Sequence, residues 1–143
     1  GNSSFIVVSK ADMTLSMYDY RGECLEKYPV ACGKNAGNKE KRGDMKTPEG
    51  VFRVCDIQQS SGWKHDFGDG KGEIEGSYGP YFIRLLTPGH QGIGIHGTHL
   101  PDSLGLRTTE GCIRLDNDNL KKLVGKVRIG DVVVITPGQM DVK

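Results

Sequence analysis

The sequence has no long apolar run and almost no net charge. No stretch approaches the ~20 consecutive apolar residues of a membrane-spanning helix, so we expect no transmembrane segment. The 19 Lys and Arg residues nearly balance the 18 Asp and Glu residues, which gives a net charge of +1. Nucleic-acid-binding domains usually carry a strong basic excess, so we expect no nucleic-acid partner.

The N-terminus also lacks an export signal. Residues 1–4 read as a trimmed or appended start, without the charged and apolar regions of a signal peptide. An export signal could have preceded them and been removed. We expect residues 1–143 to form a single domain, because a chain of this length suffices for one hydrophobic core.

Glycine is abundant, and short apolar runs recur along the chain. The 21 glycines are about twice the usual ~7% share, which suits a loop-rich β protein with tight turns. The apolar runs predict strands over residues 5–8, 14–18, 28–32, 51–57, 81–86, 92–96 and 132–136. The last run is apolar throughout, which predicts burial on both faces. The predicted fold class is mainly β, with sandwich-like mixed or antiparallel sheets.

One short helix is predicted near the C-terminus. Leu120, Leu123, Val124 and Val127 recur at the spacing of one helix face. Residues 116–119 are acidic or amide side chains, which suit a helix N-cap and first turn.

Three of the four cysteines are interpreted as small buried apolar residues. Cys24 and Cys32 lie on one extended run, too far apart for a disulfide. A disulfide between Cys55 and either of them stays open. Cys112 is expected to be a free thiol.

Two segments are irregular. The charged segment 33–46 reads as a solvated loop or as a rim that attracts substrate carboxylates. The segment 58–79 is long for a loop in a compact domain, so it is either functional, as a lid for example, or mobile. Within it, Trp63 and Phe67 could line a cleft or fill a small satellite core.

His96 and Cys112 are the candidate catalytic residues. Apolar residues precede His96 and follow Cys112, so both should lie at strand ends. A histidine beside a thiol can take its proton or form an ion pair with it. Gly111 allows close approach of the backbone, and the N–H of Cys112 is a natural donor to a developing oxyanion.

The motif His96-Gly97-Thr98, a spacer, and then 108–115 (Thr-Thr-Glu-Gly-Cys-Ile-Arg-Leu) resembles the L,D-transpeptidase catalytic domain, or YkuD-like family. Segments 44–52, 79–85 and 130–135 also fit the family, so the resemblance extends from about Phe5 to Thr136. It implies a mainly β sandwich of mixed sheets with one short helix after Cys112.

The resemblance also implies a function. Cys112 would attack the third residue of a peptidoglycan stem, release D-alanine and pass the acyl group to an amine in a 3→3 cross-link. His96 would be the base, with the Gly97 carbonyl orienting its ring. Cell-wall biogenesis, a role in cell shape, an extracytoplasmic location in the periplasm or envelope, and carbapenem inhibition of Cys112 would follow. No metal or cofactor is expected.

Glu110 departs from the family pattern, in which a second histidine commonly precedes the Gly-Cys pair. A carboxylate there would raise the pKa of Cys112 if it lay near the sulfur; it could instead point away or pair with Arg114. Arg114, Thr109, Tyr81 and Trp63 are candidate substrate-binding residues. Arg114 could equally brace the loop through an acidic neighbour.

Three functions remain open on the sequence. They are an L,D-transpeptidase, an L,D-carboxypeptidase in which water takes the acyl group, and a non-catalytic peptidoglycan-binding module. The enzyme readings predict that Cys112 alkylates with a pH midpoint well below that of a free thiol. A binding module predicts an unreactive Cys112. The acceptor and the oligomeric state stay open.

Overall fold

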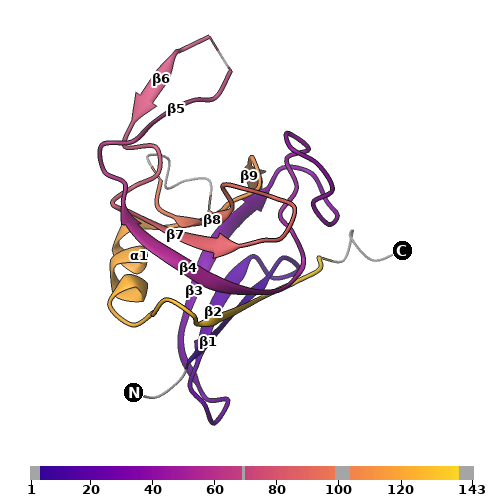
Figure 1. Ribbon diagram of the computed structural model, residues 1–143, viewed down its shortest axis with the longest axis vertical. Helices are drawn as coiled ribbons and strands as arrows, with labels where there is room; N and C mark the ends of the chain where they lie inside the picture. The colour runs from indigo at the N-terminus through magenta and orange to yellow at the C-terminus, as the bar shows by residue number, and fades with distance from the viewer. Residues whose placement is uncertain (1–3, 69, 99–103, 139–143) are drawn as a thin grey trace.

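The computed structural model describes residues 4–68, 70–98 and 104–138. Eleven strands and one helix are assigned in this part of the chain (Figure 1). They are β1 (Phe5–Ser9), β2 (Thr14–Tyr18), β3 (Cys24–Gly33), β4 (Gly50–Gln59), β5 (Lys64–Asp66), β6 (Glu73–Glu75), β7 (Tyr81–Leu86), β8 (Gly94–His96), β9 (Arg107–Thr109), β10 (Ile113–Leu115), α1 (Asn117–Val124) and β11 (Val132–Thr136). No helix among these residues is long and apolar enough to cross a membrane.

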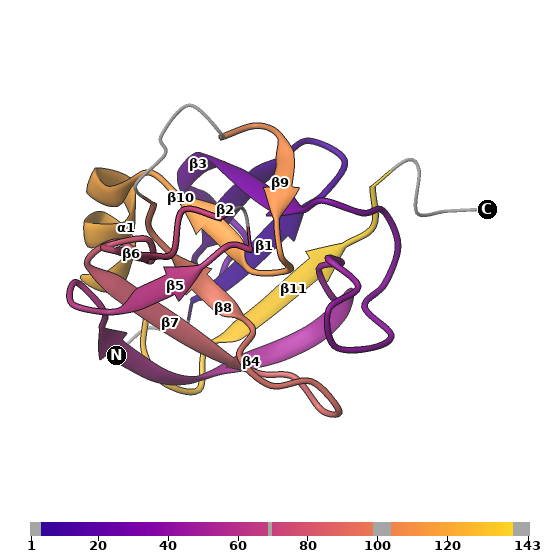
Figure 2. The ribbon, with the colours of Figure 1, turned by 90° about the horizontal axis from the view of Figure 1, so that it is seen from above.

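Nine of the strands form one mixed sheet, in the order β10-β8-β7-β4-β11-β1-β2-β3-β9. A further pairing joins β10 to β3, so the sheet closes on itself like a barrel (Figure 2). The first and last strands are parallel neighbours in its centre, with Phe5 opposite Val132. The predicted fold class, mainly β with one helix after Cys112, is confirmed.

The core lies inside the closed sheet and under the helix. Inward residues alternate along β1 and β2, with Ile6, Val8 and Leu15 fully buried. In β11 only Val133 and Ile135 are buried, and the other three residues are half-buried. The prediction of burial on both faces is therefore wrong for β11, because the strand packs against the core on one side only.

The helix begins where it was predicted to begin, but it ends one turn before the predicted end. The Asp116 carboxylate accepts hydrogen bonds from the backbone N–H groups of Asp118 and Asn119, which caps the first turn. Gly125 follows the last helical residue. Val127 is still buried and completes the apolar face.

The cysteines differ from the prediction in two of three cases. All four are free thiols, and Cys32 is buried, but Cys24 and Cys55 are exposed. Cys24 begins β3 next to a hairpin turn. Cys55 lies in β4 between Val54 and Asp56, where the pairing of β4 with β7 shifts register. At these positions the side chain faces away from the core.

The irregular segment 58–79 contains a small hairpin. Strands β5 and β6 pair only with each other, and His65 lies opposite Ile74. The hairpin projects from the main sheet (Figure 1). It brings His65 and Phe67 to the same cleft that His96 and Cys112 line.

Candidate active site

His96 ends β8, and Cys112 directly precedes β10, the parallel neighbour of β8. In the register of β8 with β10, His96 is opposite Arg114 and Ile95 is opposite Ile113. Because side chains alternate along a strand, Cys112, His96 and Arg114 project to the same side. All three line a cleft of about 1260 Å³. The fold therefore brings together the two residues that the sequence singled out.

The Cys112 thiol is protonated in the resting site. Its Sγ donates to the carbonyl oxygen of Gly92 at 3.2 Å. Burial raises the pKa of Cys112 to about 11, although a backbone hydrogen bond from Gly94 and the charge of Arg114 oppose the rise. This direction is opposite to the low pH midpoint predicted for an enzyme, because desolvation of the thiolate outweighs the nearby positive charges.

Alkylation of Cys112 by iodoacetamide should therefore rise with pH and reach half its maximum near pH 11, well above the ~8.5 of a free thiol. Only the thiolate reacts, and its fraction grows as the pH approaches the raised pKa. The rate should be followed on the Cys112 peptide by mass spectrometry, because Cys24 and Cys55 are exposed and would be alkylated as well. A midpoint at or below that of a free thiol would show a thiolate–imidazolium pair instead.

His96 is held as one neutral tautomer. Its Nδ1 lies 2.6 Å from the Gly97 carbonyl oxygen. A carbonyl only accepts, so Nδ1 carries the proton and Nε2 has a free lone pair. The ring is 5% exposed. Burial lowers the pKa of His96 to about 4, while the bond to Gly97 acts in the opposite direction. A neutral imidazole with a free Nε2 is suited to accept a proton.

Aromatic rings fix the plane of the imidazole. Phe82 stacks on His96 with ring centroids 5.6 Å apart and an interplanar angle of 11°. Tyr78 meets the ring edge-on at 5.0 Å. Trp63 packs against both Tyr78 and Phe82. Trp63 is not among the described residues that line the cleft. It therefore supports the site through its contacts with Tyr78 and Phe82.

The segment after His96 is clamped by the first residue of the helix. The Thr98 N–H donates to Asn117 Oδ1 at 2.8 Å, and Asn117 Nδ2 donates to the Thr98 carbonyl at 3.0 Å. A Cβ atom on Gly97 would collide with Asn117 Oδ1. Asn117 therefore holds the backbone that carries the Gly97 carbonyl. The sequence analysis placed Asn117 only in the first turn of the helix.

Cys112 follows a tight turn in which the Thr109 side chain is hydrogen-bonded to the backbone of the turn itself. The Thr109 hydroxyl accepts from the Gly111 N–H at 3.2 Å and donates to the Cys112 carbonyl at 2.7 Å. Gly111 has a φ of +135°, a conformation that favours glycine. With 2% of its surface exposed, Thr109 stabilises the turn.

Comparisons with known proteins identify the family of the chain. Residues 3–135 match the family model of the YkuD L,D-transpeptidase catalytic domain. The chain belongs to the L,D-transpeptidase family. It is 33% identical, over 132 residues and 92% of its length, to a putative L,D-transpeptidase YkuD of Bacillus licheniformis. The chain spans 65% of the length of that relative.

Solved structures share the fold. The helical cell shape determining protein Pgp2 of Campylobacter jejuni superposes with a TM-score of 0.70 at 27% identity, over 96% of this chain and 49% of that chain. LdtMt1, an LD transpeptidase solved in complex with imipenem, superposes with a TM-score of 0.69 at 20% identity, over 95% of this chain and 60% of that one. The second likeness supports the fold alone.

Glu110, which occupies the place of the common family histidine, forms an ion pair with the hairpin. Its carboxylate contacts Nε2 of His65. The other ring nitrogen of His65 lies 3.1 Å from the Tyr78 hydroxyl. Glu110 thus contacts His65, His65 contacts Tyr78, and the Tyr78 ring packs against His96. No local pattern pointed to His65, because 45 residues separate it from Glu110.

The remaining candidates divide between the cleft and its surroundings. Arg114 lines the cleft with only 5% of its surface exposed, and burial lowers its pKa. Tyr81 packs against the hydrophobic core and is not among the described lining residues. Among the residues that the structure does describe, no three His, Cys, Asp or Glu side chains gather as a metal site.

Proposed function

We propose that this domain is a peptidoglycan L,D-transpeptidase with Cys112 as its nucleophile and His96 as its base. The observation that carries the proposal is the placement of both side chains in one cleft, with His96 held in the tautomer whose free Nε2 can accept a proton. The family membership supports the reaction class.

The reaction starts from a neutral pair. Sγ of Cys112 attacks the carbonyl carbon of the third stem residue, and the thiol proton passes to Nε2 of His96. The Cys112 N–H stabilises the tetrahedral oxyanion. His96 returns the proton to the departing amine of D-alanine, which leaves a thioester on Cys112. An amine of a second stem then attacks the thioester and regenerates the thiol.

The charge of the cleft suits an anionic peptide stem. Lys39, Arg42, Arg84 and Arg114 line it, whereas Glu110 is the only carboxylate among the described lining residues. Glu110 is itself paired with His65. The resulting positive potential would attract stem carboxylates. Arg114 and Arg84 also lie near enough to lower the pKa of Cys112 against burial.

Several consequences rest on the same proposal. Peptidoglycan lies outside the cytoplasm, so the domain would act in the periplasm or cell envelope and contribute to cell-wall biogenesis. The likeness to a cell shape determining protein supports a role in cell shape. Carbapenems would acylate Cys112 if it is the nucleophile that the family resemblance implies.

The test is mass spectrometry of the protein incubated with disaccharide-tetrapeptide, beside the Cys112→Ala variant. A transpeptidase gives cross-linked dimer and free D-alanine, and the variant gives neither. Tripeptide without dimer would replace the proposal with an L,D-carboxypeptidase. Absence of product and of any adduct on Cys112 would favour a peptidoglycan-binding module.

A further inference from the structure

The peptide bond between Gly111 and Cys112 carries the proposed oxyanion donor. In a trans peptide the carbonyl and the N–H point in opposite directions within one plane. Whatever fixes the Gly111 carbonyl therefore also aims the Cys112 N–H. That carbonyl accepts a hydrogen bond from Oγ1 of Thr47 at 2.7 Å, across 64 residues of sequence.

Thr47 has no freedom to turn its hydroxyl elsewhere. Its Oγ1 accepts from the Gly33 N–H at 2.8 Å, so its single proton is committed to Gly111. Thr47 is only 1% exposed. The Thr47 carbonyl in turn accepts from Nζ of Lys10 at 2.9 Å, and that buried ammonium forms an ion pair with Glu49.

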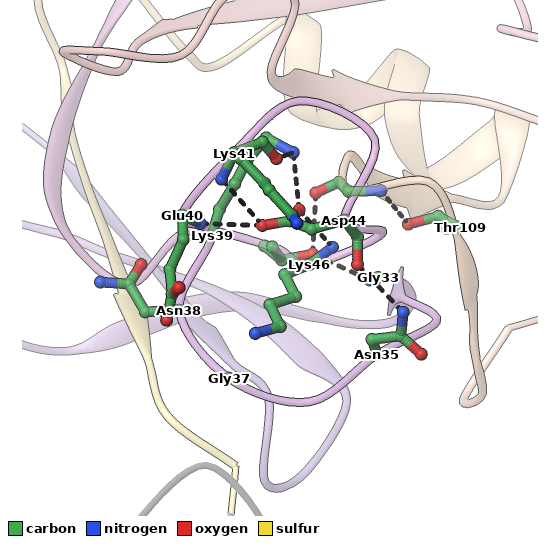
Figure 3. Close-up of polar contacts among 12 residues, drawn as sticks. Gly33, Asn35, Gly37, Asn38, Lys39, Glu40, Lys41, Asp44, Lys46 and Thr109 are labelled. Carbon is green, nitrogen blue, oxygen red and sulfur yellow. Dashed lines mark hydrogen bonds and ion pairs between the residues drawn. The ribbon is translucent and has the colours of Figure 1, made fainter.

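The preceding loop forms a rigid platform for Thr47. Figure 3 shows it folded around Asp44, whose carboxylate accepts from the backbone N–H groups of Glu40, Lys41 and Lys46 and from Nζ of Lys39. Burial would raise the pKa of Asp44, but these donors hold it well below its usual value. The prediction of a solvated loop is therefore wrong at Asp44 and Lys39, whose side chains are 6% and 7% exposed.

The platform is in direct contact with the turn of the nucleophile. The Lys34 N–H donates to the Thr109 carbonyl at 2.8 Å. A Cβ atom on Gly111 would lie 2.9 Å from the Lys46 carbonyl oxygen. This close approach is possible because residue 111 is glycine, and it places the Thr47 hydroxyl against the Gly111 carbonyl.

We infer that Thr47 is a positioning residue, which orients the Gly111–Cys112 peptide so that the Cys112 N–H faces the developing oxyanion. The inference rests on the proposed function in that the step concerned is acylation of Cys112. It gives a role to a residue that the sequence marked only as part of the family-like segment 44–52. Thr47 touches no reacting atom and acts through the peptide that it holds.

The test compares two reactions of Cys112 in Thr47→Val and Thr47→Ser. Acetylation by p-nitrophenyl acetate forms an Sγ–C bond, passes the thiol proton to the base and expels p-nitrophenolate through a tetrahedral oxyanion. Alkylation by iodoacetamide is a displacement without an oxyanion. Both rates are read on the Cys112 peptide at one pH, and thermal unfolding shows how much of each variant is folded.

Thr47→Val, which lacks the hydroxyl, should slow acetylation by roughly 10- to 100-fold, somewhat less than deletion of an oxyanion donor. Alkylation should change by less than about 2-fold, because it needs no such donor. Thr47→Ser keeps the hydroxyl and should restore acetylation to within about 3-fold of the original. Parallel loss of both reactions, or unchanged acetylation in Thr47→Val, would overturn the inference.

The test stays informative in two difficult cases. If Thr47→Val does not fold, Thr47→Cys replaces it, because its thiol has a similar shape and is a weaker donor. Since p-nitrophenyl acetate is an activated ester, its reaction does not require a peptidoglycan substrate. A chain that acetylates with the expected Thr47 dependence but ignores disaccharide-tetrapeptide would overturn the proposed function and support the positioning role.

Discussion

His96→Gln should slow acylation of Cys112 by about 10³-fold at pH 7, within the range for loss of a general base. Burial holds the thiol protonated, with a pKa of about 11, so acylation needs a group that removes the proton as the Sγ–C bond forms. Glutamine can keep a polar contact with the Gly97 carbonyl but cannot accept a proton. The measurement is the rate of thioester formation with disaccharide-tetrapeptide, followed by mass spectrometry.

The deficit should shrink as the pH rises. Near pH 11 a large fraction of Cys112 is ionised without help, so the original and the variant should approach the same rate. Thermal unfolding of His96→Gln should remain cooperative, since Phe82 and Tyr78 still enclose the side chain. A deficit of the same size at every pH would mean that His96 supports the structure of the site and does not act as its base.

Gly97→Ala should lower the free energy of unfolding by about 3 kcal/mol, at the upper end of overpacking effects. The new methyl group would collide with Asn117 Oδ1 and come within 3.0 Å of the Gly79 Cα atom. Neither neighbour can move freely, because Asn117 is bonded to both polar groups of Thr98, and Gly79 is bonded through its N–H to Gly76 and through its carbonyl to Ser60. Acylation should fall as well, because the displaced carbonyl no longer orients His96.

Gly125→Ala is the matched control for this effect. Gly125 has a φ of −68°, and an added Cβ would meet its nearest neighbour at an ordinary 3.5 Å. This substitution should be neutral or stabilise the fold by roughly 0.5 kcal/mol. Chemical unfolding gives both values. The double variant Gly97→Ala with Asn117→Ala should lose less than the sum of the single losses, and strict additivity would contradict the clash.

The longer strands and the helix were predictable because each leaves a local pattern, whereas the short strands β5, β6 and β9 were not predicted. Leu120 and Leu123 mark one face of α1, and the Asp116 carboxylate caps its start. The placement of His96 and Cys112 in one cleft followed from two strand ends and the family-like motif. Their pKa values did not, because burial depends on distant chain segments that no local pattern shows.

Long-range polar contacts were the main features that the sequence concealed. Glu110 meets His65 across 45 residues, and Thr47 meets Gly111 across 64. In the charged loop, the mixture of signs suggested exposure to solvent, whereas Asp44 gathers backbone donors and is buried. A sequence shows the residue types that could form such contacts but not which of them the fold brings together.

The position of β11 in the sheet has a consequence for the order of folding. Of the described strands, β11 comes last in the sequence, yet it lies between β4 and β1 and pairs with both. Until it emerges, those two strands have open edges that invite wrong pairing or aggregation. The main sheet can therefore form only after residue 136 has been made, and folding should be slow because its decisive contacts join β1 to β11, which are far apart in sequence.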